Sequence, residues 1–164
     1  VLDRMDQIID DVLALTWGGQ DPAPDDLSAC SLLQLAETCW DHVDTAGASL
    51  HIDAPASLIA EEGRLQRLLE NLFRNAIDHG GDEVTIWIGP LDDGFFVEDD
   101  GPGIPDSTRD EIFEAGYSSA DEGTGLGLNI VQTIADAHGW TVAATDGHHG
   151  GARFEVRDVE RPDV

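Results

Sequence analysis

The sequence has no lysine, few cysteines and no long apolar run. All 8 of its basic residues are arginines, and the 34 acidic residues against them give a formal net charge of −26 over 164 residues. Because a surface this negative repels nucleic acids and anionic membranes, we expect neither as a direct partner. No stretch reaches the roughly 18 consecutive apolar residues of a membrane span, and none resembles a signal peptide. The composition therefore predicts a cytoplasmic domain, in a protein that is as a whole either soluble or attached to a membrane.

The 2 cysteines, Cys30 and Cys39, fall in a segment whose pattern predicts a single helix. Along a helix their separation corresponds to about 13 Å of rise, which is too long for a disulfide. Neither belongs to a Cys-x-x-Cys pattern, so we expect no metal site there and two free thiols in a reducing compartment.

The acidic residues are spread over every segment rather than gathered in one block, so a disordered acidic tail does not explain them. Self-repulsion of this size is tolerable where salt screens it, and the Debye length falls to about 3 Å at 1 M salt. Our hypothesis is therefore a halophilic origin, namely a halophilic archaeon whose cytoplasm holds molar salt.

Four segments are expected along the chain. Residues 1–17 carry apolar side chains at alternating three- and four-residue steps, which is typical of one helix of a coiled coil or helical hairpin. Glycine and proline then mark a linker over residues 18–24. Residues 25–157 should form one domain, followed by a short tail over 158–164.

Within the domain, the hydrophobic pattern predicts a mixture of helices and strands without regular alternation. The most regular helix covers 61–79, where apolar residues follow the i, i+3, i+4, i+7 rule. The other expected helices cover 26–43 and 126–138, and the expected strands cover 49–53, 84–88, 95–98, 140–145 and 152–157. Gly139 is placed to cap the helix over 126–138, residues 90–94 have the composition of a turn, and Arg67 and Glu70 should lie on the solvent face of the helix over 61–79. This order favours an α+β two-layer sandwich, with one mixed sheet of about five strands and three helices on one face.

Two glycine clusters enclose a long segment without regular pattern. The first is Asp99-Asp100-Gly101-Pro102-Gly103 after a strand, and the second is Gly123-Thr124-Gly125-Leu126-Gly127 before a helix. A loop of that length in a compact domain is usually a functional lid. Gly101 and Gly103 let the backbone approach a flat ligand, while bare N–H groups at a helix N-terminus attract phosphate. We interpret the stretch as a nucleotide site under a lid.

Each of these elements alone has a commoner explanation. Asp-Gly-Pro-Gly is usually a turn, and the asparagines at 71 and 75 could simply form a polar helix face. Their order along the chain is more specific. An Asn-bearing helix comes first, then a strand ending in Asp-x-Gly-x-Gly, then a phenylalanine in the long loop, then the second glycine cluster.

With these motifs, the sequence resembles the ATP-binding catalytic domain of sensor histidine kinases, in the superfamily shared with gyrase, the large heat-shock chaperone and the mismatch-repair ATPase. The N box corresponds to residues 71–76, the first glycine box to 99–103, the phenylalanine box to 112–114 and the second glycine box to 123–128. The resemblance covers about residues 25–157.

The resemblance implies a role for each motif. Asp99, flanked by Gly101 and Gly103, should accept a hydrogen bond from the exocyclic amine of adenine. Asn71 and Asn75 should hold a Mg²⁺ ion that bridges the phosphates of ATP. The phosphate tail should lie against the backbone N–H groups of the second glycine box, namely Thr124, Gly125, Leu126 and Gly127.

Two further side chains each have two possible roles. The resemblance puts His79 beside the phosphates, but a histidine at a helix end can equally interact with the C-terminal dipole. Phe113 is either an anchor of the lid or part of the core.

Three departures from the family pattern matter. Asn71 stands where the chaperone and gyrase branches have a glutamate that activates water, and Glu70 lies about 100° away around the helix. This disfavours hydrolysis and suits a kinase. The lid contains a single cation, Arg109. Ala152 stands where some relatives have a threonine near the adenine, which puts a water-mediated contact there in doubt.

None of the 6 histidines lies in the setting of a phosphoacceptor, that is, a histidine followed by an acidic residue on a dimerisation helix. We therefore expect a fragment that transfers the γ-phosphoryl of Mg-ATP to a histidine hairpin of the same protein, which dimerises at full length and signals to a response regulator. The alternatives are a non-catalytic ATP-sensing module and a clamp-type ATPase of the gyrase class.

Overall fold

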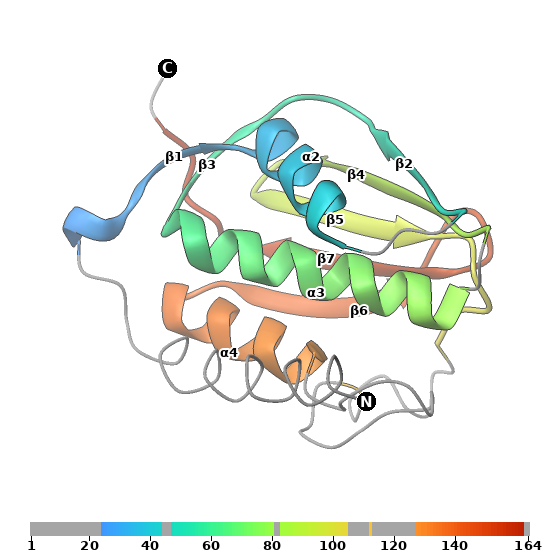
Figure 1. Cartoon of the computed structure of the whole chain (residues 1–164). Coiled ribbons are helices and arrows are strands. Elements are labelled where there is room, and N and C mark those ends of the chain that lie inside the picture. The colour runs from blue at the N-terminus through green and yellow to red at the C-terminus, as the bar shows by residue number, and fades with distance from the viewer. Residues whose placement is uncertain (1–23, 44–46, 81–82, 105–111, 113–126, 163–164) are drawn as a thin grey trace, which may run out of the picture.

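A mixed sheet of 5 strands forms one layer of the fold, and helices α2, α3 and α4 cover one of its faces (Figure 1). The computed structural model describes residues 24–43, 47–80, 83–104, 112 and 127–162. The elements are η1 (Pro24–Asp26), β1 (Ser28–Ser31), α2 (Leu32–His42), β2 (Ser49–Ile52), β3 (Ser57–Ala60), α3 (Glu62–Gly80), β4 (Thr85–Leu91), β5 (Gly94–Asp99), α4 (Gly127–His138), β6 (Thr141–Asp146) and β7 (Ala152–Arg157).

The sheet order is β2-β4-β5-β7-β6. Strand β2 runs parallel to β4, and all other neighbours are antiparallel. Strands β1 and β3 pair separately as a 2-stranded antiparallel sheet. The predicted α+β sandwich with a mixed sheet is therefore confirmed, and the small second sheet is an addition to it.

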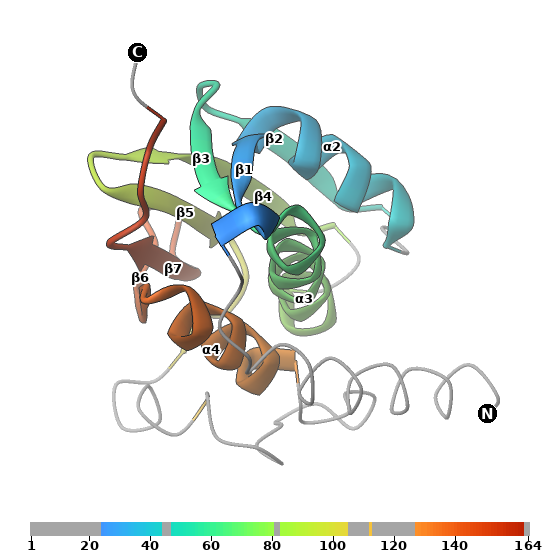
Figure 2. The same ribbon diagram turned by 90° about the vertical axis from the view of Figure 1, so that its left-hand side faces the viewer.

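Helix α3 is the centre of the helical layer. Figure 2 views it nearly end-on, between α2 and α4, and both of these helices pack against it. Its apolar stripe is buried, as predicted for 61–79, at Leu65, Leu68, Leu69, Leu72, Phe73 and Ala76, and only partly buried at Ile77. Burying a side chain of this size contributes about 1.5–3 kcal/mol, so this helix makes a large contribution to the core, which also includes residues of α2, α4 and the small sheet.

The helix predicted over 26–43 is wrong in its first third. Residues 28–31 form β1, and α2 begins only at Leu32. The Ser31 hydroxyl accepts a hydrogen bond from the Gln34 N–H at 3.3 Å, which is an N-cap, and serine side chains favour such caps over helix interiors. Strand β1 also finds a partner in β3, an element that the hydrophobic pattern did not predict.

The cysteines consequently lie in different elements, Cys30 in β1 and Cys39 in α2, so the argument from helical rise was wrong. Both thiols are nevertheless buried and free, as expected. Burial raises the pKa of Cys39 to about 12, with a further contribution from the charge of Glu70.

Two turns can be compared with the sequence prediction, namely the end of α4 and the turn between β4 and β5. Gly139 ends α4 with a φ of 78°, and the Trp140 N–H donates to the Ala135 carbonyl at 2.8 Å, which confirms the predicted C-cap. The turn expected over 90–94 is shorter than predicted, because Pro90 and Leu91 still pair within the β4–β5 hairpin. Pro90 lacks an N–H, but a strand position that donates no ladder hydrogen bond tolerates it.

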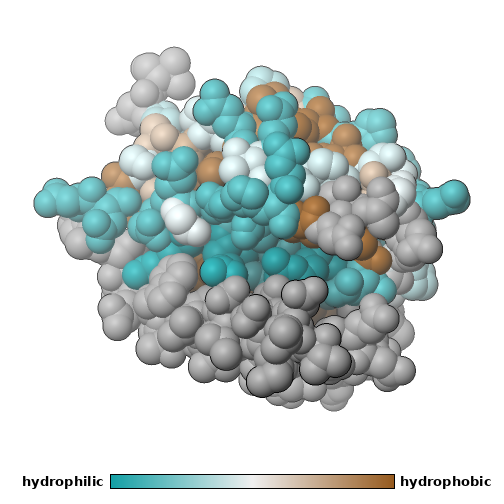
Figure 3. All heavy atoms as spheres, in the orientation of Figure 1, coloured by the Kyte–Doolittle hydropathy of each residue, from teal (hydrophilic) through white to brown (hydrophobic). Residues whose placement is uncertain are grey.

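The surface agrees with the charge excess of the sequence. In the view of Figure 3 the described residues are mainly hydrophilic, with a smaller hydrophobic area towards the upper edge. Among the helices that the structure describes, none combines the length and apolar character needed to cross a membrane. The helix and most of the linker predicted over 1–24 lie outside the described residues.

Candidate functional site

Asp99 is the last residue of β5 and has only 7% of its surface exposed. Side chains alternate along a strand, so Asp99 shares the helix-facing side of the sheet with Phe95 and Val97. Its Oδ1 accepts hydrogen bonds from the backbone N–H groups of Gly101 at 2.9 Å and Ala152 at 3.3 Å. The carboxylate is therefore held in one orientation by the main chain on both sides of it.

The neighbouring carboxylate, that of Asp100, makes a different set of hydrogen bonds. Asp100 is exposed, its Oδ1 accepts from the Thr85 N–H at 2.8 Å, and its own N–H donates to the Thr85 carbonyl at 3.3 Å. These bonds fasten the end of β5 to the start of β4. Of the two adjacent aspartates, only Asp99 faces the interior beside α3.

Glycines bring the backbone close to this carboxylate. A Cβ on Gly101 would lie 2.8 Å from the Gly80 Cα, so the loop after β5 can cross the end of α3 only with glycine there. A Cβ on Gly151 would lie 2.4 Å from the Asp99 Oδ1, again too close for any side chain. Gly103 has a φ of 80°, which favours glycine.

Ala152 and Gly151 were missed as contributors to this site. The alanine at 152 was noted only for the threonine it lacks, but its backbone N–H binds Asp99 directly, whatever the side chain. The available signal was the pair Gly150-Gly151 immediately before a strand, because paired glycines at a strand start often mark a close approach of two backbones.

Asn71 occupies the middle of α3 with 2% of its surface exposed. Its Nδ2 donates to the Arg67 carbonyl at 2.8 Å, so the assignment of the amide is fixed and Oδ1 points elsewhere. That oxygen faces the first residue of α4, since a Cβ on Gly127 would lie 3.3 Å from it. Asn75 is half-buried and lies one turn further along the same face of α3.

Helix α3 thus connects the two parts of the predicted site. Its last residue, Gly80, meets Gly101 near Asp99, and its middle meets Gly127 at the start of α4. The structure brings Asn71, Asn75, Asp99, Gly101 and Gly127 onto or beside this one helix, while Gly103 lies against the backbone of Gly150 and Gly151. The side chain of His79, together with Phe113, Thr124, Gly125 and Leu126, lies outside the described residues. Their predicted roles therefore stay predictions.

The chemistry of the donors fits a hard cation bound together with phosphate. In the part of the chain that the structure describes, no three His, Cys, Asp or Glu side chains are grouped so that they could hold a metal ion. Amide oxygens such as those of Asn71 and Asn75 are acceptable ligands for Mg²⁺, which usually takes few protein ligands and shares its sphere with phosphate oxygens and water.

A cavity of about 530 Å³ lies at the other end of α3 and is separate from this site. It is lined by Asp26, Glu61, Gly63, Arg64, Gln66, Arg67 and Glu70. Arg67 and Glu70, expected on the solvent face, are half-buried here. The Glu70 carboxylate lies 3.5 Å from the imidazole of His42 on α2, and thus points towards α2 rather than α4.

Comparison with known proteins agrees with this geometry. The family model described as histidine kinase-, DNA gyrase B-, and HSP90-like ATPase matches residues 60–161. The chain belongs to this family. Among solved structures it is similar to the mycobacterial sensor histidine kinase MprB, with a TM-score of 0.70, 23% identity, and coverage of 83% of this chain and 99% of that one.

Longer relatives match as well. Full-length ShkA in complex with AMPPNP has a TM-score of 0.71 and 26% identity over 99% of this chain and 37% of that chain. The signal transduction histidine-protein kinase AfsQ2 of Streptomyces coelicolor is 36% identical over 106 residues, and the sensor histidine kinase CpxA of Escherichia coli is 29% identical over 167. AfsQ2 and CpxA carry the names of histidine kinases, the enzyme class that the sequence predicts. The matched regions are 20% of AfsQ2 and 36% of CpxA, so the chain corresponds to a minor part of each.

Proposed function

We propose that this domain binds Mg-ATP and positions its γ-phosphoryl group for transfer to a histidine on a helical hairpin of the same protein. The observation that carries the proposal is the buried carboxylate of Asp99, fixed by the N–H groups of Gly101 and Ala152 beside the helix that bears Asn71. A carboxylate in this position recognises a donor such as the adenine amine, and a hydrogen bond to a charged group contributes about 1.5–3 kcal/mol.

The phosphate end is assigned to the start of α4. The oxygens of Asn71 and Asn75 would hold a magnesium ion there, and such an ion would neutralise the negative charge of the phosphates during transfer. Because both ligands are neutral amides, the positive charge of the ion is left for the phosphates. The backbone N–H groups before and at Gly127 would bind the phosphate oxygens.

Transfer is favoured over hydrolysis by the groups beside the phosphate end. An amide such as Asn71 cannot take a proton from water as a carboxylate can. Glu70, the carboxylate next to Asn71 in the sequence, lies against His42 of α2. The protein therefore contributes positioning and electrostatics, which is what phosphoryl transfer requires.

The acceptor and downstream partners follow from this assignment. We propose that residues 1–17 are the end of the second helix of a dimerising hairpin, joined by a linker over 18–24 to the catalytic domain over 25–157. The rest of a longer cytoplasmic kinase would supply the acceptor histidine, and a response regulator would receive the phosphoryl group in a two-component phosphorelay. The even spread of acidic residues supports a halophilic archaeal origin.

The experiment mixes the domain with its own histidine hairpin and γ-labelled ATP in molar potassium chloride. Acid-labile phosphohistidine on the hairpin is expected. Tight ATP binding without any transfer would contradict the proposal and favour an ATP-sensing module, and steady phosphate release by the domain alone would favour a clamp-type ATPase.

A further inference from the structure

Glu98, the residue before Asp99, is a carboxylate with only 2% of its surface exposed. It points to the outer face of the sheet, the face away from the helices, because neighbouring residues of a strand alternate. A buried carboxylate requires hydrogen-bond partners to offset its desolvation. Oε1 accepts from the Arg153 guanidinium at 2.9 Å, and Oε2 accepts from the backbone N–H of His148 at 2.8 Å.

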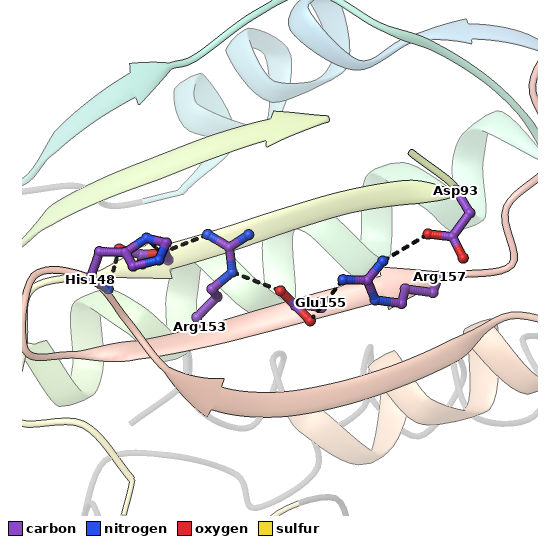
Figure 4. A network of polar contacts seen from close by, with 6 residues as sticks. Asp93, His148, Arg153, Glu155 and Arg157 are labelled. Atoms are coloured by element: carbon purple, nitrogen blue, oxygen red, sulfur yellow. Dashed lines mark hydrogen bonds and ion pairs between the residues drawn. The ribbon is translucent and has the colours of Figure 1, made fainter. Parts of the chain in front are cut away.

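The guanidinium of Arg153 is held in place by two contacts besides its hydrogen bond to Glu98. Its guanidinium carbon lies 4.0 Å above the centre of the Phe96 ring, and its Nε donates to Glu155 at 2.8 Å. Arg157 then joins Glu155 to Asp93, so that charged side chains follow one another along β7 (Figure 4). The hydrogen bond from Arg153 holds the pKa of Glu155 below its ordinary value.

The turn between β6 and β7, residues 147–151, is pinned to the outer face by the same carboxylate. Besides the bond from the His148 N–H, the His148 and His149 imidazoles lie 3.6 and 4.0 Å from the Glu98 oxygens. The His149 ring also stacks on Trp87, with 3.8 Å between the ring centres. A Cβ on Gly147 would lie 3.0 Å from the Glu98 Cγ.

The other side of this turn meets Asp99. The backbone of Gly151 lies so close to the Asp99 carboxylate that no side chain fits between them, and the next N–H, that of Ala152, donates to Asp99 Oδ1. The Gly147 N–H donates to the Gly151 carbonyl at 2.8 Å and closes the turn. One short turn is thus held between two consecutive carboxylates that point in opposite directions.

We propose that Glu98 is a positioning residue for adenine recognition. By holding the 147–151 turn, it fixes the Gly151 and Ala152 backbone that orients Asp99, and it acts through Asp99 rather than on the nucleotide. This inference rests on the proposed role of Asp99.

Glutamine at position 98 is the sharpest test of this role. Both carboxylate oxygens accept from donors, whereas glutamine offers one acceptor oxygen and one NH₂ donor. Its NH₂ must therefore face either the Arg153 guanidinium or the His148 N–H, donor against donor. Glutamine can therefore keep either the bond from the His148 N–H or the bond from Arg153, but not both, so the turn is held less firmly while the volume of the side chain is unchanged.

The readout is the preference for adenine, measured by calorimetry with ATP and with the purine riboside triphosphate that lacks the exocyclic amine. In Glu98→Gln, the ratio of the two affinities should fall about threefold to tenfold. In Glu155→Gln, the matched control, which removes the same charge from the outer face and contacts Arg153, the ratio should stay that of the wild type. Glu98→Gln combined with Asp99→Asn should lower the ratio no further than Asp99→Asn alone.

Equal losses of affinity for both nucleotides in Glu98→Gln, or an unchanged ratio, would overturn the inference, since a merely structural role does not discriminate between them. A wild type without preference for ATP would instead overturn the proposed role of Asp99. If circular dichroism shows that Glu98→Gln does not fold, Arg153→Gln is measured in the same way. A lowered ratio is expected there, and an unchanged ratio overturns the inference.

Discussion

The amide oxygen of Asn71 in α3 faces Gly127, the first residue of α4, so closely that a Cβ on Gly127 would lie 3.3 Å from it. The Nδ2 of the same amide is bonded to the Arg67 carbonyl one turn earlier. A polar oxygen is thereby directed from the central helix to a helix N-terminus, where the backbone favours anions. An ion held between an amide oxygen and a phosphate group needs such an oxygen close to such a helix N-terminus.

Asn75→Ala should abolish the magnesium dependence of ATP binding, because it removes one of the two amide oxygens assigned to the ion. Calorimetric titration with and without Mg²⁺ measures this. We expect the gain in affinity on adding Mg²⁺ to fall at least tenfold, the equivalent of about 1.4 kcal/mol. Gln66→Ala, an amide lost from the opposite end of α3 beside the 530 Å³ cavity, is the control. An unaltered response to Mg²⁺ in Asn75→Ala would exclude the assigned role.

Asp99→Asn should weaken ATP binding at least tenfold and leave the fold intact. The substitution keeps an oxygen for the Gly101 and Ala152 N–H groups but removes the charge, and charged hydrogen bonds contribute about 1.5–3 kcal/mol. Asp100→Asn is the matched control, since its carboxylate binds the Thr85 N–H instead. Equal ATP affinities of Asp99→Asn and the wild type would discredit the adenine assignment.

His138 should make stability fall in mild acid. Burial lowers the pKa of this imidazole, whose Nδ1 lies 2.9 Å from the Ile134 carbonyl and whose Nε2 accepts from the Glu61 N–H at 3.1 Å. Because the folded pKa lies below the unfolded value of about 6.5, the unfolded state binds the extra proton first. The contribution is present above pH 6.5 and is lost as the pH falls through the folded pKa.

Urea unfolding of wild type and His138→Gln at pH 7.5 and 5.5 measures this effect. The loss of unfolding free energy between the two pH values should be smaller in the variant, because the glutamine does not titrate. The carboxylates contribute equally to both proteins and cancel in the comparison. The same pH dependence in both proteins would show that His138 is not responsible.

Helix content should depend on salt. At millimolar salt the net charge of −26 is poorly screened, and self-repulsion favours the unfolded chain. Circular dichroism at 222 nm should therefore show helicity rising with potassium chloride towards molar concentrations, with sucrose at matched osmolality as a control for non-ionic effects. A signal that is indifferent to potassium chloride over this range would refute the halophilic hypothesis.

The sequence allowed prediction of the parts of the molecule that depend on local pattern. The stripe of α3 and the cap at Gly139 each follow from periodicity or from a motif of a few residues. Strand β1 was assigned to a helix because its partner, β3, lies about 30 residues away and each strand has only 4 residues. No local pattern encodes such a pairing.

Contacts across long separations account for what was missed in the site. Ala152 and Asp99 are 53 positions apart, and Arg153 and Glu98 are 55 apart, so only the β5–β7 register brings them together. That register places Glu98 opposite Arg153 and leaves the preceding glycines against Asp99. The sequence showed that apolar and charged residues alternate in β7, but it did not show which strands would pair with β7.

A crystal structure of the domain with a non-hydrolysable ATP analogue and Mg²⁺ in molar potassium chloride tests the central claim most directly. We predict that the exocyclic amine of the adenine lies within hydrogen-bond distance of Asp99, with the metal ion beside Asn71 and Asn75 and the phosphates at the start of α4. An analogue bound elsewhere, or a space beside Asp99 filled by packed side chains, would contradict the account.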